Sequence, residues 1–124
     1  MKFQKDTNFI TGRLKSLKYA FSGALKLIAT EHSVMVQTSL AILLQFAGFY
    51  FNIDRTEWLF QTLAIGLVIS IEGLNTAVEK VADFIHPNFN NQIGFIKDIA
   101  AGAVFFAAVT AIAIGFIIYL PKFI

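Results

Sequence analysis

Three long apolar stretches constrain the fold of this chain more than any other feature. The first runs from Val34 to Phe51 and the third from Ile99 to Leu120, and neither contains a charged residue. The second has no charge from Trp58 to Ile71 and then continues into polar positions. A helix needs about 20 apolar residues to cross a bilayer. We therefore expect an all-α membrane protein with three transmembrane helices.

The composition supports one membrane domain over residues 1–124. Hydrophobic residues make up 56% of the chain and charged residues 15%, which is too apolar for a soluble domain of this size. There is no cysteine, so disulfides and zinc–thiolate sites are excluded. No glycine-rich phosphate loop is found, and nucleic-acid binding has no support. We expect a surface helix at 11–32 and spans at 33–52, 57–85 and 93–120.

The segment before the first span predicts an amphipathic helix with a basic edge. Thr11 is the expected N-cap. Apolar residues recur at helical spacing, with lysines and a serine beside them: Leu14, Leu17, Phe21, Leu25 and Ile28, flanked by Lys15, Lys18, Ser22 and Lys26. Such a helix is expected to lie in the membrane surface. Attraction to anionic lipid alone would also explain the lysines.

The positive charges predict the orientation of the spans. Six of them precede the first span, namely Lys2, Lys5, Arg13, Lys15, Lys18 and Lys26, and Lys80 and Lys97 flank the loop between the second and third spans. The opposite side has only Arg55 and Lys122. Because positive residues are retained on the cytoplasmic side, we expect a multi-pass protein of the inner (cytoplasmic) cell membrane with its N-terminus in the cytoplasm.

A polar stripe interrupts the second span. Glu72, Asn75, Glu79 and Asp83 are spaced by 3, 4 and 4 residues, which places them within about 80° of arc on one helix. Carboxylates at membrane depth usually mark a functional site. Glu72 is the deepest and has no Lys or Arg within a turn, so it is the candidate general base. The structural alternative is that Glu72 only accepts a hydrogen bond from Asn75 of a neighbouring subunit.

Other charged residues lie near the cytoplasmic interface, where Glu31 and Glu79 are expected at the same level. Two such carboxylates would repel each other unless a cation lay between them or one kept its proton, and divalent cations such as Mg²⁺ bind carboxylate oxygens. Lys97 and Asp98 allow two interpretations, anchoring of the third span or a charge for a polyphosphate. Asp83 is either a solvated helix-end residue or part of the site.

The sequence from Glu72 to Asp83 resembles the signature of the small prokaryotic integral-membrane diacylglycerol kinase family, which includes undecaprenol kinases. That signature is Glu-x-x-Asn-[Ser/Thr]-Ala-x-Glu-x-x-x-Asp. Lys97-Asp98-Ile-Ala-Ala-Gly-Ala is similar to the family's second motif, and Tyr19, Gly23 and Glu31 fall at matching positions. The resemblance extends from about Arg13 to Leu120. The chain departs from many relatives after Glu31 and in the uncharged loop 88–91.

The resemblance implies a homotrimeric lipid kinase with active sites between subunits. It would transfer the γ-phosphate of Mg-ATP to a lipid alcohol at the cytoplasmic interface, with diacylglycerol, giving phosphatidic acid, as the favoured substrate and undecaprenol as the alternative. The resemblance implies that Glu72 is the general base and contacts the substrate, and that Asn75 supports Glu72 in catalysis. It further implies that Glu31 and Glu79 are Mg²⁺ ligands. The implied ATP contacts are Tyr19, Glu31, Glu79, Lys97 and Asp98.

A second alternative from a different class is a non-enzymatic oligomer that conducts protons or cations along the stripe. A conduction path would need the stripe to continue to the outer turn. No charged residue lies between Glu72 and that turn, so the sequence favours the kinase.

Overall fold

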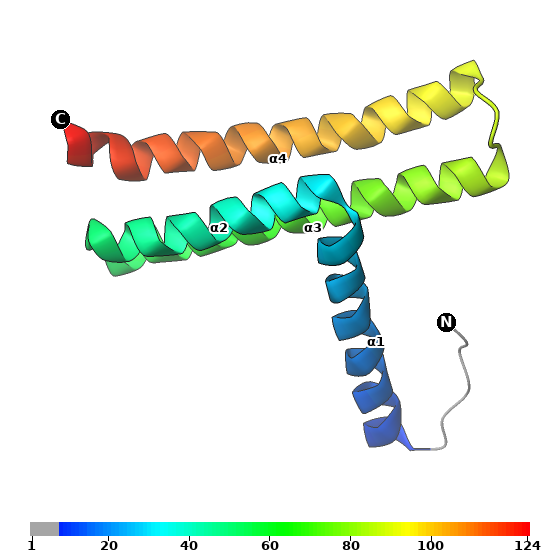
Figure 1. Ribbon diagram of the computed structural model, residues 1–124, viewed down its shortest axis with the longest axis horizontal. Coiled ribbons are helices and arrows are strands. Elements are labelled where there is room, and N and C mark those ends of the chain that lie inside the picture. The colour runs from blue at the N-terminus through cyan, green and yellow to red at the C-terminus, as the bar shows by residue number, and fades with distance from the viewer. Residues whose placement is uncertain (1–7) are drawn as a thin grey trace.

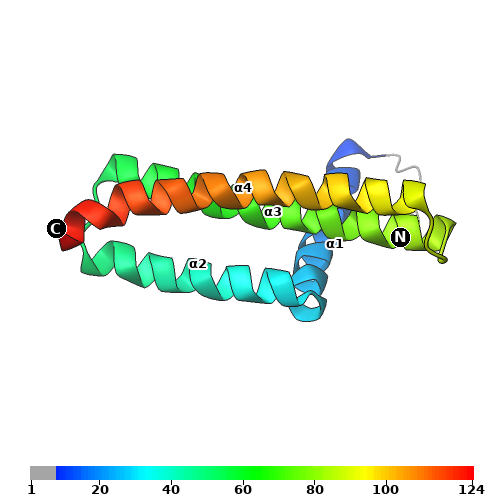
Figure 2. The same cartoon turned by 90° about the horizontal axis from the view of Figure 1, so that it is seen from above.

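The computed structural model describes residues 8–124, which form four helices. They are α1 (Phe9–Thr30), α2 (His32–Tyr50), α3 (Arg55–Ile85) and α4 (Asn91–Phe123). Helices α2, α3 and α4 run side by side, and α1 leaves them at a steep angle on the side opposite α4 (Figures 1 and 2). The expected three spans are confirmed, because α2, α3 and α4 are each long and apolar enough to cross a membrane. Lys2 and Lys5 lie outside the described residues.

Helix α1 begins and ends two residues before its predicted bounds. The side chain of Asn8, not Thr11, caps the helix by accepting a hydrogen bond from the Ile10 N–H at 3.0 Å. An asparagine is as good an N-cap as a threonine. The helix stops at Thr30 because Glu31 has an extended backbone, with φ −104° and ψ 116°. This single non-helical residue is the corner between α1 and α2.

The turn between α2 and α3 is short and firmly capped. Asn52 has a positive φ of 54°, a conformation that asparagine tolerates better than most residues. Asp54 and Glu57 form a reciprocal capping box, in which each carboxylate accepts from the other residue's backbone N–H, at 2.8 and 3.0 Å. Helix α3 therefore starts at Arg55, two residues before the predicted start of the span.

The far ends of α3 and α4 follow local sequence signals. Helix α3 ends at Ile85, the predicted end of the second span, with His86 as its cap; Pro87 follows, and proline disfavours helix in the residue before it. Helix α4 begins at Asn91, where the side chain of Asn90 accepts from the Ile93 N–H at 2.8 Å. It continues past the predicted end at 120 and includes Pro121 in its last turn.

The bundle is tied together where α2 turns into α3, which we call the turn end. Phe51 contacts the rings of Tyr119 and Phe123, with centroids 5.9 and 5.0 Å away. Trp58 packs on Gly48 so closely that a Cβ there would lie 2.6 Å from an indole carbon. At the opposite end, which we call the loop end, a short loop connects α3 to α4, and α2 does not extend this far (Figure 1).

The helices differ in length, and this sets the depth of their residues. At 1.5 Å per residue, α2 is about 28 Å long, close to the thickness of the hydrocarbon core, whereas α3 and α4 are about 46 and 50 Å long. Because all three meet at the turn end, α3 and α4 extend beyond α2 at the loop end. Helix α1 joins the bundle at this boundary (Figure 2).

Candidate functional site

The polar stripe of α3 runs from a buried to an exposed position. Glu72 is 8% exposed and lies seventeen residues after Arg55, or about 26 Å from the start of α3. This is close to the level at which α2 begins. Glu79 and Asp83 lie farther along α3, past that level, and are exposed. The burial of the stripe within the chain therefore decreases toward the loop end.

Glu72 has a hydrogen-bond partner that the sequence did not suggest. Gln37 of α2 donates from Nε2 to Glu72 Oε2 at 3.4 Å. Asn75, which the resemblance made the support of Glu72, instead donates from Nδ2 to Glu79 Oε1 at 3.3 Å. The Oδ1 atom of Asn75 is buried without a partner. An acceptor oxygen thus lies next to the exposed carboxylate of Glu79.

The other candidate metal ligand, Glu31, does not lie on the same helix as Glu79. Glu31 lies in the corner between α1 and α2, and its carboxylate is 3.9 Å from Lys80, the residue after Glu79. No three His, Cys, Asp or Glu side chains gather closely enough to hold a metal ion anywhere in residues 8–124. The part of the chain that the structure describes therefore does not complete a carboxylate metal site by itself.

The lysine expected to bind phosphate is held by a carboxylate. Lys97 Nζ lies 2.7 Å from Asp83 Oδ1, and both side chains are partly exposed. This ion pair links the loop ends of α3 and α4. Asp98 is exposed beside it, and Tyr19 lies in the middle of α1 with 45% of its surface exposed. Exposed ion pairs contribute little to stability, so Lys97 can exchange Asp83 for another anion at small cost.

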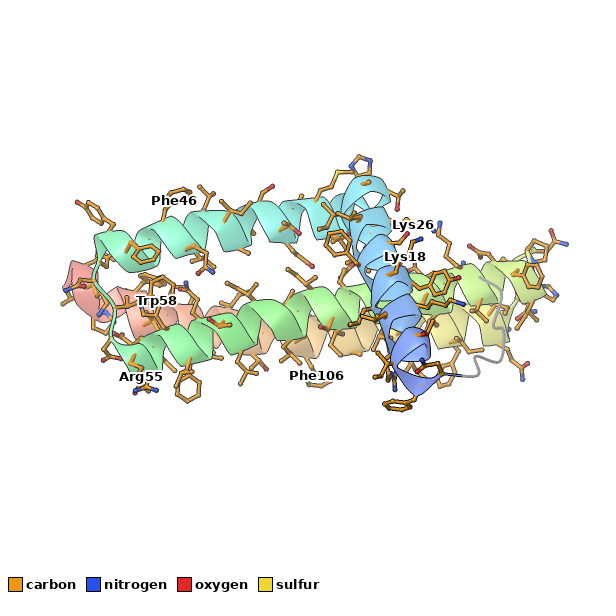
Figure 3. All side chains as sticks on the ribbon, turned by 90° about the horizontal axis from the view of Figure 1, so that it is seen from below. Lys18, Lys26, Phe46, Arg55, Trp58 and Phe106 are labelled. Carbon is orange, nitrogen blue, oxygen red and sulfur yellow. The ribbon has the colours of Figure 1, made fainter. Side chains whose placement is uncertain are left out.

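Helix α1 passes α3 next to the buried carboxylate. A Cβ on Gly73 would lie 3.0 Å from Leu27 Cδ1, so the missing side chain lets α1 approach α3 one residue from Glu72. Figure 3 shows Lys18 and Lys26 along α1 as it crosses the bundle. No residue of α1 is buried. Its large apolar side chains are mostly more than half exposed, including Phe9, Leu14, Leu17, Phe21 and Leu25.

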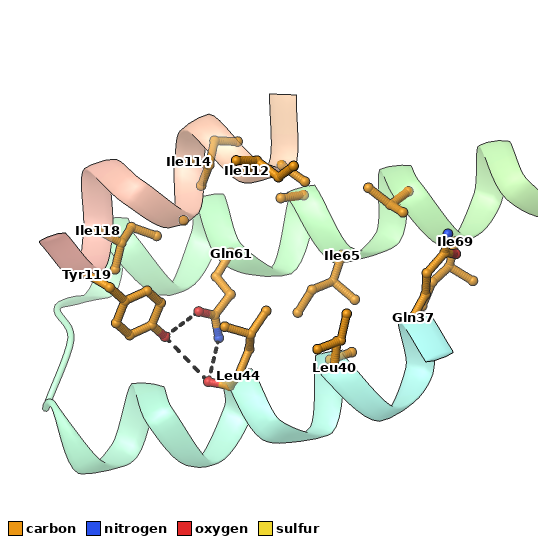
Figure 4. Close-up of a pocket in the computed structure, with 15 residues that line it drawn as sticks. Gln37, Leu40, Leu44, Gln61, Ile65, Ile69, Ile112, Ile114, Ile118 and Tyr119 are labelled. Carbon is orange, nitrogen blue, oxygen red and sulfur yellow. Dashed lines mark hydrogen bonds between the residues drawn. The ribbon is translucent and has the colours of Figure 1, made fainter. Parts of the chain in front are cut away.

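An apolar cavity of about 280 Å³ lies between α2, α3 and α4. Its lining is aliphatic or glycine except for Gln37, Gln61 and Tyr119. Figure 4 shows Gln37 toward one end of the cavity and the pair Gln61 and Tyr119 at the other. Since Gln37 contacts Glu72, one end of the cavity lies beside the buried carboxylate.

A buried polar cluster closes the turn end of this cavity. Gln61 is 3% exposed and donates to Leu44 O at 3.0 Å and Gln45 Oε1 at 3.2 Å. Its own Oε1 accepts from the Tyr119 hydroxyl. The sequence analysis missed Gln37 and Gln61. The signal that could have found them is an uncharged amide in a stretch otherwise suited to lipid, because buried polar groups need partners there.

The arrangement combines two chemical environments at one level of the bundle. Glu72 is a buried carboxylate with an apolar cavity beside it. Beyond it, Glu79, Asp83 and Lys97 are partly or fully exposed. A base at this boundary can take a proton from a group presented from the apolar side, while a charged, water-soluble reactant approaches from the exposed side.

Comparison with known proteins gives matches over most of the chain. The family described as prokaryotic diacylglycerol kinase matches residues 18–119. The chain is 35% identical to undecaprenol kinase from Bacillus subtilis (strain 168), over 87% of this chain and 88% of that protein. It is 30% identical to diacylglycerol kinase from Synechocystis sp., over 87% of this chain and 62% of that protein.

Proposed function

This chain belongs to the prokaryotic diacylglycerol kinase family, and from that premise we propose how its residues carry out the reaction of a membrane-embedded lipid kinase. The observation that carries the proposal is the burial of Glu72 beside an apolar cavity. A lipid alcohol would place the part of its chain nearest the hydroxyl in the cavity, with the hydroxyl toward Glu72 and the rest of the tail in the surrounding lipid. ATP would approach from the exposed, cytoplasmic side of the boundary.

In the proposed reaction, Glu72 accepts the proton of the lipid hydroxyl as that oxygen attacks the γ-phosphorus of ATP. A new oxygen–phosphorus bond forms, the bond between the γ-phosphorus and the bridging oxygen breaks, and ADP leaves. Glu72 later returns the proton to water. Lys97 would leave Asp83 and balance the phosphate charge. Positioning and charge compensation supply most of the catalysis in phosphoryl transfer.

The oxygen atoms around Glu79 fit a magnesium ion in their chemistry. Mg²⁺ is usually bound through one or two carboxylates together with the substrate's phosphates. Glu79 is an exposed carboxylate, and the neighbouring Asn75 Oδ1 is buried without a partner. We assign Glu79 and Glu31 as the residues that would hold the ion, which when bound would neutralise charge on the phosphates.

Assembly from several subunits would bring together two groups of site residues, Tyr19 and Glu31 at α1 and its junction with α2, and those at the loop ends of α3 and α4. Helix α1 has no buried residue and projects away from its own bundle (Figure 1). In a homotrimer, the α1 of one subunit would lie in the membrane surface against the next subunit. Tyr19 and Glu31 would then complete a nucleotide site with Glu79, Lys97 and Asp98 of the neighbour. The N-terminus and the loop end would face the cytoplasm of the inner (cytoplasmic) membrane, as the charge distribution predicted.

The cavity favours a polyprenol over diacylglycerol as the lipid alcohol. Diacylglycerol has two ester carbonyls close to its hydroxyl, and each needs a hydrogen-bond donor when it is removed from water. Gln37 is the only polar side chain lining the Glu72 end of the cavity, and it already donates to Glu72. A polyprenol has no such carbonyls. The Bacillus subtilis relative named undecaprenol kinase supports the same choice.

The test is ATP-dependent phosphorylation of undecaprenol and diacylglycerol, compared by kcat/KM in the same mixed micelles. Glu72→Gln keeps the shape of the side chain but removes the base, so we expect a loss of about 10²-fold or more in kcat. Glu57→Gln is the matched control on the same helix, because glutamine also completes a capping box. Turnover by Glu72→Gln similar to that of the control would remove Glu72 from this role. A higher kcat/KM for diacylglycerol would refute the substrate choice alone.

A further inference from the structure

Gln37 connects the apolar cavity to the candidate base of the proposed site. It lines the apolar cavity, yet its Nε2 faces the carboxylate of Glu72 at 3.4 Å. Within the described residues this is the only side-chain hydrogen bond to Glu72, and it comes from a different helix. Hydrogen bonds in catalytic sites are often long before the substrate binds. Gln37 is therefore placed to control the direction in which Glu72 points.

The orientation of the Gln37 amide shows which of its contacts dominates. With Nε2 toward Glu72, the Oε1 atom is buried and has no partner. A buried acceptor without a partner is unfavourable, because it has lost its hydrogen bonds to water and gained none in return. Turning the amide over would place Oε1 against a carboxylate oxygen, where both atoms are acceptors. The contact with Glu72 thus fixes the amide at the expense of its other end.

If Gln37 had only a structural role, that role would be to hold α2 against α3. Other residues already make this connection. At the turn end, Gln61 donates to Leu44 O and Gln45 Oε1 of α2, and Trp58 packs on Gly48. Closer to the loop end, Val34 is fully buried three residues before Gln37. Helix α2 therefore has apolar and polar contacts that hold it in place without Gln37.

We infer that Gln37 is a positioning residue that holds the Glu72 carboxylate toward the lipid hydroxyl. This inference rests on the proposed role of Glu72 as the base. A free glutamate side chain has several rotamers, and only some of them bring a carboxylate oxygen within reach of Gln37, which lines the cavity. A donor on α2 restricts Glu72 to one of these before the substrate arrives. A misplacement of 1 Å in a reacting group can lower a rate by about 10²-fold.

The experiment compares three substitutions at Gln37 with one control. Gln37→Leu removes the donor, Gln37→Glu keeps the shape but offers only acceptors when ionised, and Gln37→His keeps a ring N–H that can donate. Gln45→Leu is the control, since it makes the same change two turns along α2. For each variant, kcat and the KM values for Mg-ATP and the lipid are measured together with thermal stability in micelles.

We expect Gln37→Leu and Gln37→Glu to lose about tenfold to a hundredfold in kcat while KM for Mg-ATP stays within about twofold. Gln37→His should keep most of kcat, and Gln45→Leu should keep kcat as well, although its thermal stability should fall because Gln61 Nε2 loses an acceptor. Unchanged kcat in the Leu and Glu variants would overturn the inference, as would an equal loss in the Glu and His variants. If Gln37→Leu does not fold, the comparison of Glu with His decides alone.

A second measurement does not depend on activity. The infrared carboxylate band of Glu72, assigned by difference against Glu72→Gln, should move in Gln37→Leu and stay in place in Gln45→Leu. An unmoved band in Gln37→Leu would overturn the inference, whatever the effect of that substitution on kcat. If the unaltered protein phosphorylates neither lipid, the proposed function fails, and the infrared comparison still shows whether Gln37 orients Glu72.

Discussion

Replacing Tyr119 with phenylalanine should destabilise the bundle at the turn end through a single missing oxygen. The Tyr119 hydroxyl donates to Gln61 Oε1, and Gln61 is only 3% exposed. Its amide nitrogen is already bonded to Leu44 O and Gln45 Oε1. In the Tyr119→Phe variant, Gln61 Oε1 would remain buried with no partner, because the side chain cannot turn without breaking those two bonds.

The expected decrease in the free energy of unfolding is about 1–2 kcal/mol. A net hydrogen bond contributes about 1 kcal/mol, and a buried acceptor left alone costs about 1–3 kcal/mol. Side-chain hydrogen bonds between membrane helices average about 0.6 kcal/mol and reach about 1.7 kcal/mol. Because Gln61 has so little freedom to find a new partner, we expect a value in the upper part of that range.

The assay is reversible unfolding in mixed micelles by increasing the fraction of a denaturing detergent. Trp58 is the only tryptophan in the chain and lies at the turn end, so its fluorescence reports this region. Tyr50→Phe is the control, since Tyr50 is 83% exposed. Gln61→Leu and the double variant complete a cycle, in which the double loss should be smaller than the sum by about 0.5–1 kcal/mol. A Tyr119→Phe loss equal to that of Tyr50→Phe, or strict additivity, would refute the cluster's role.

Three further predictions concern packing, magnesium and assembly. Gly48→Ala should destabilise the protein by about 1–3 kcal/mol by overpacking against the indole, whereas Gly66→Ala, with open space around it, should change the unfolding midpoint little; equal midpoints would contradict the close contact. Glu31→Ala or Glu79→Ala should raise the Mg²⁺ concentration needed for half-maximal activity, and a titration matching the unaltered protein would exclude a shared metal site. At an Mg²⁺ concentration where Glu31→Ala is nearly inactive, a mixture of Glu72→Gln and Glu31→Ala subunits should regain activity after joint refolding if sites form between subunits; a mixture no more active than its components, while each variant still oligomerises, would place the site within one subunit.

The spans and the helical spacing of the stripe could be predicted because they depend on the chain's local sequence. An uncharged apolar run specifies a helix suited to lipid, and a helical period places Glu72 and Glu79 on one face. Even the end of α3 at Ile85 follows from Pro87. Helix starts were less accurate, since α1 is capped by Asn8 and not by Thr11, three residues later, and α3 starts directly after Asp54.

The partners of the polar residues could not be predicted, because they come from distant parts of the chain. Gln37 is 35 residues from Glu72, and Tyr119 is 58 residues from Gln61. Which amide meets which partner depends on how far α2 and α4 slide along α3, and no local pattern encodes that distance. The assignment of Asn75 to Glu72 shows the same limit, because Asn75 bonds Glu79, one helical turn away on its own helix.

The length of α2 sets both the position and the direction of α1. Helix α2 is fixed at the turn end, and α1 departs from its other end through the single residue Glu31. One inserted residue in α2 would move that corner by about 1.5 Å and rotate the direction of α1 by about 100° around the axis of α2. Leu27 would then leave Gly73, and α1 would point away from the level of Glu72. Insertions between α3 and α4, near residues 87–90, carry no such angular penalty, so length variation should be tolerated there and selected against in α2.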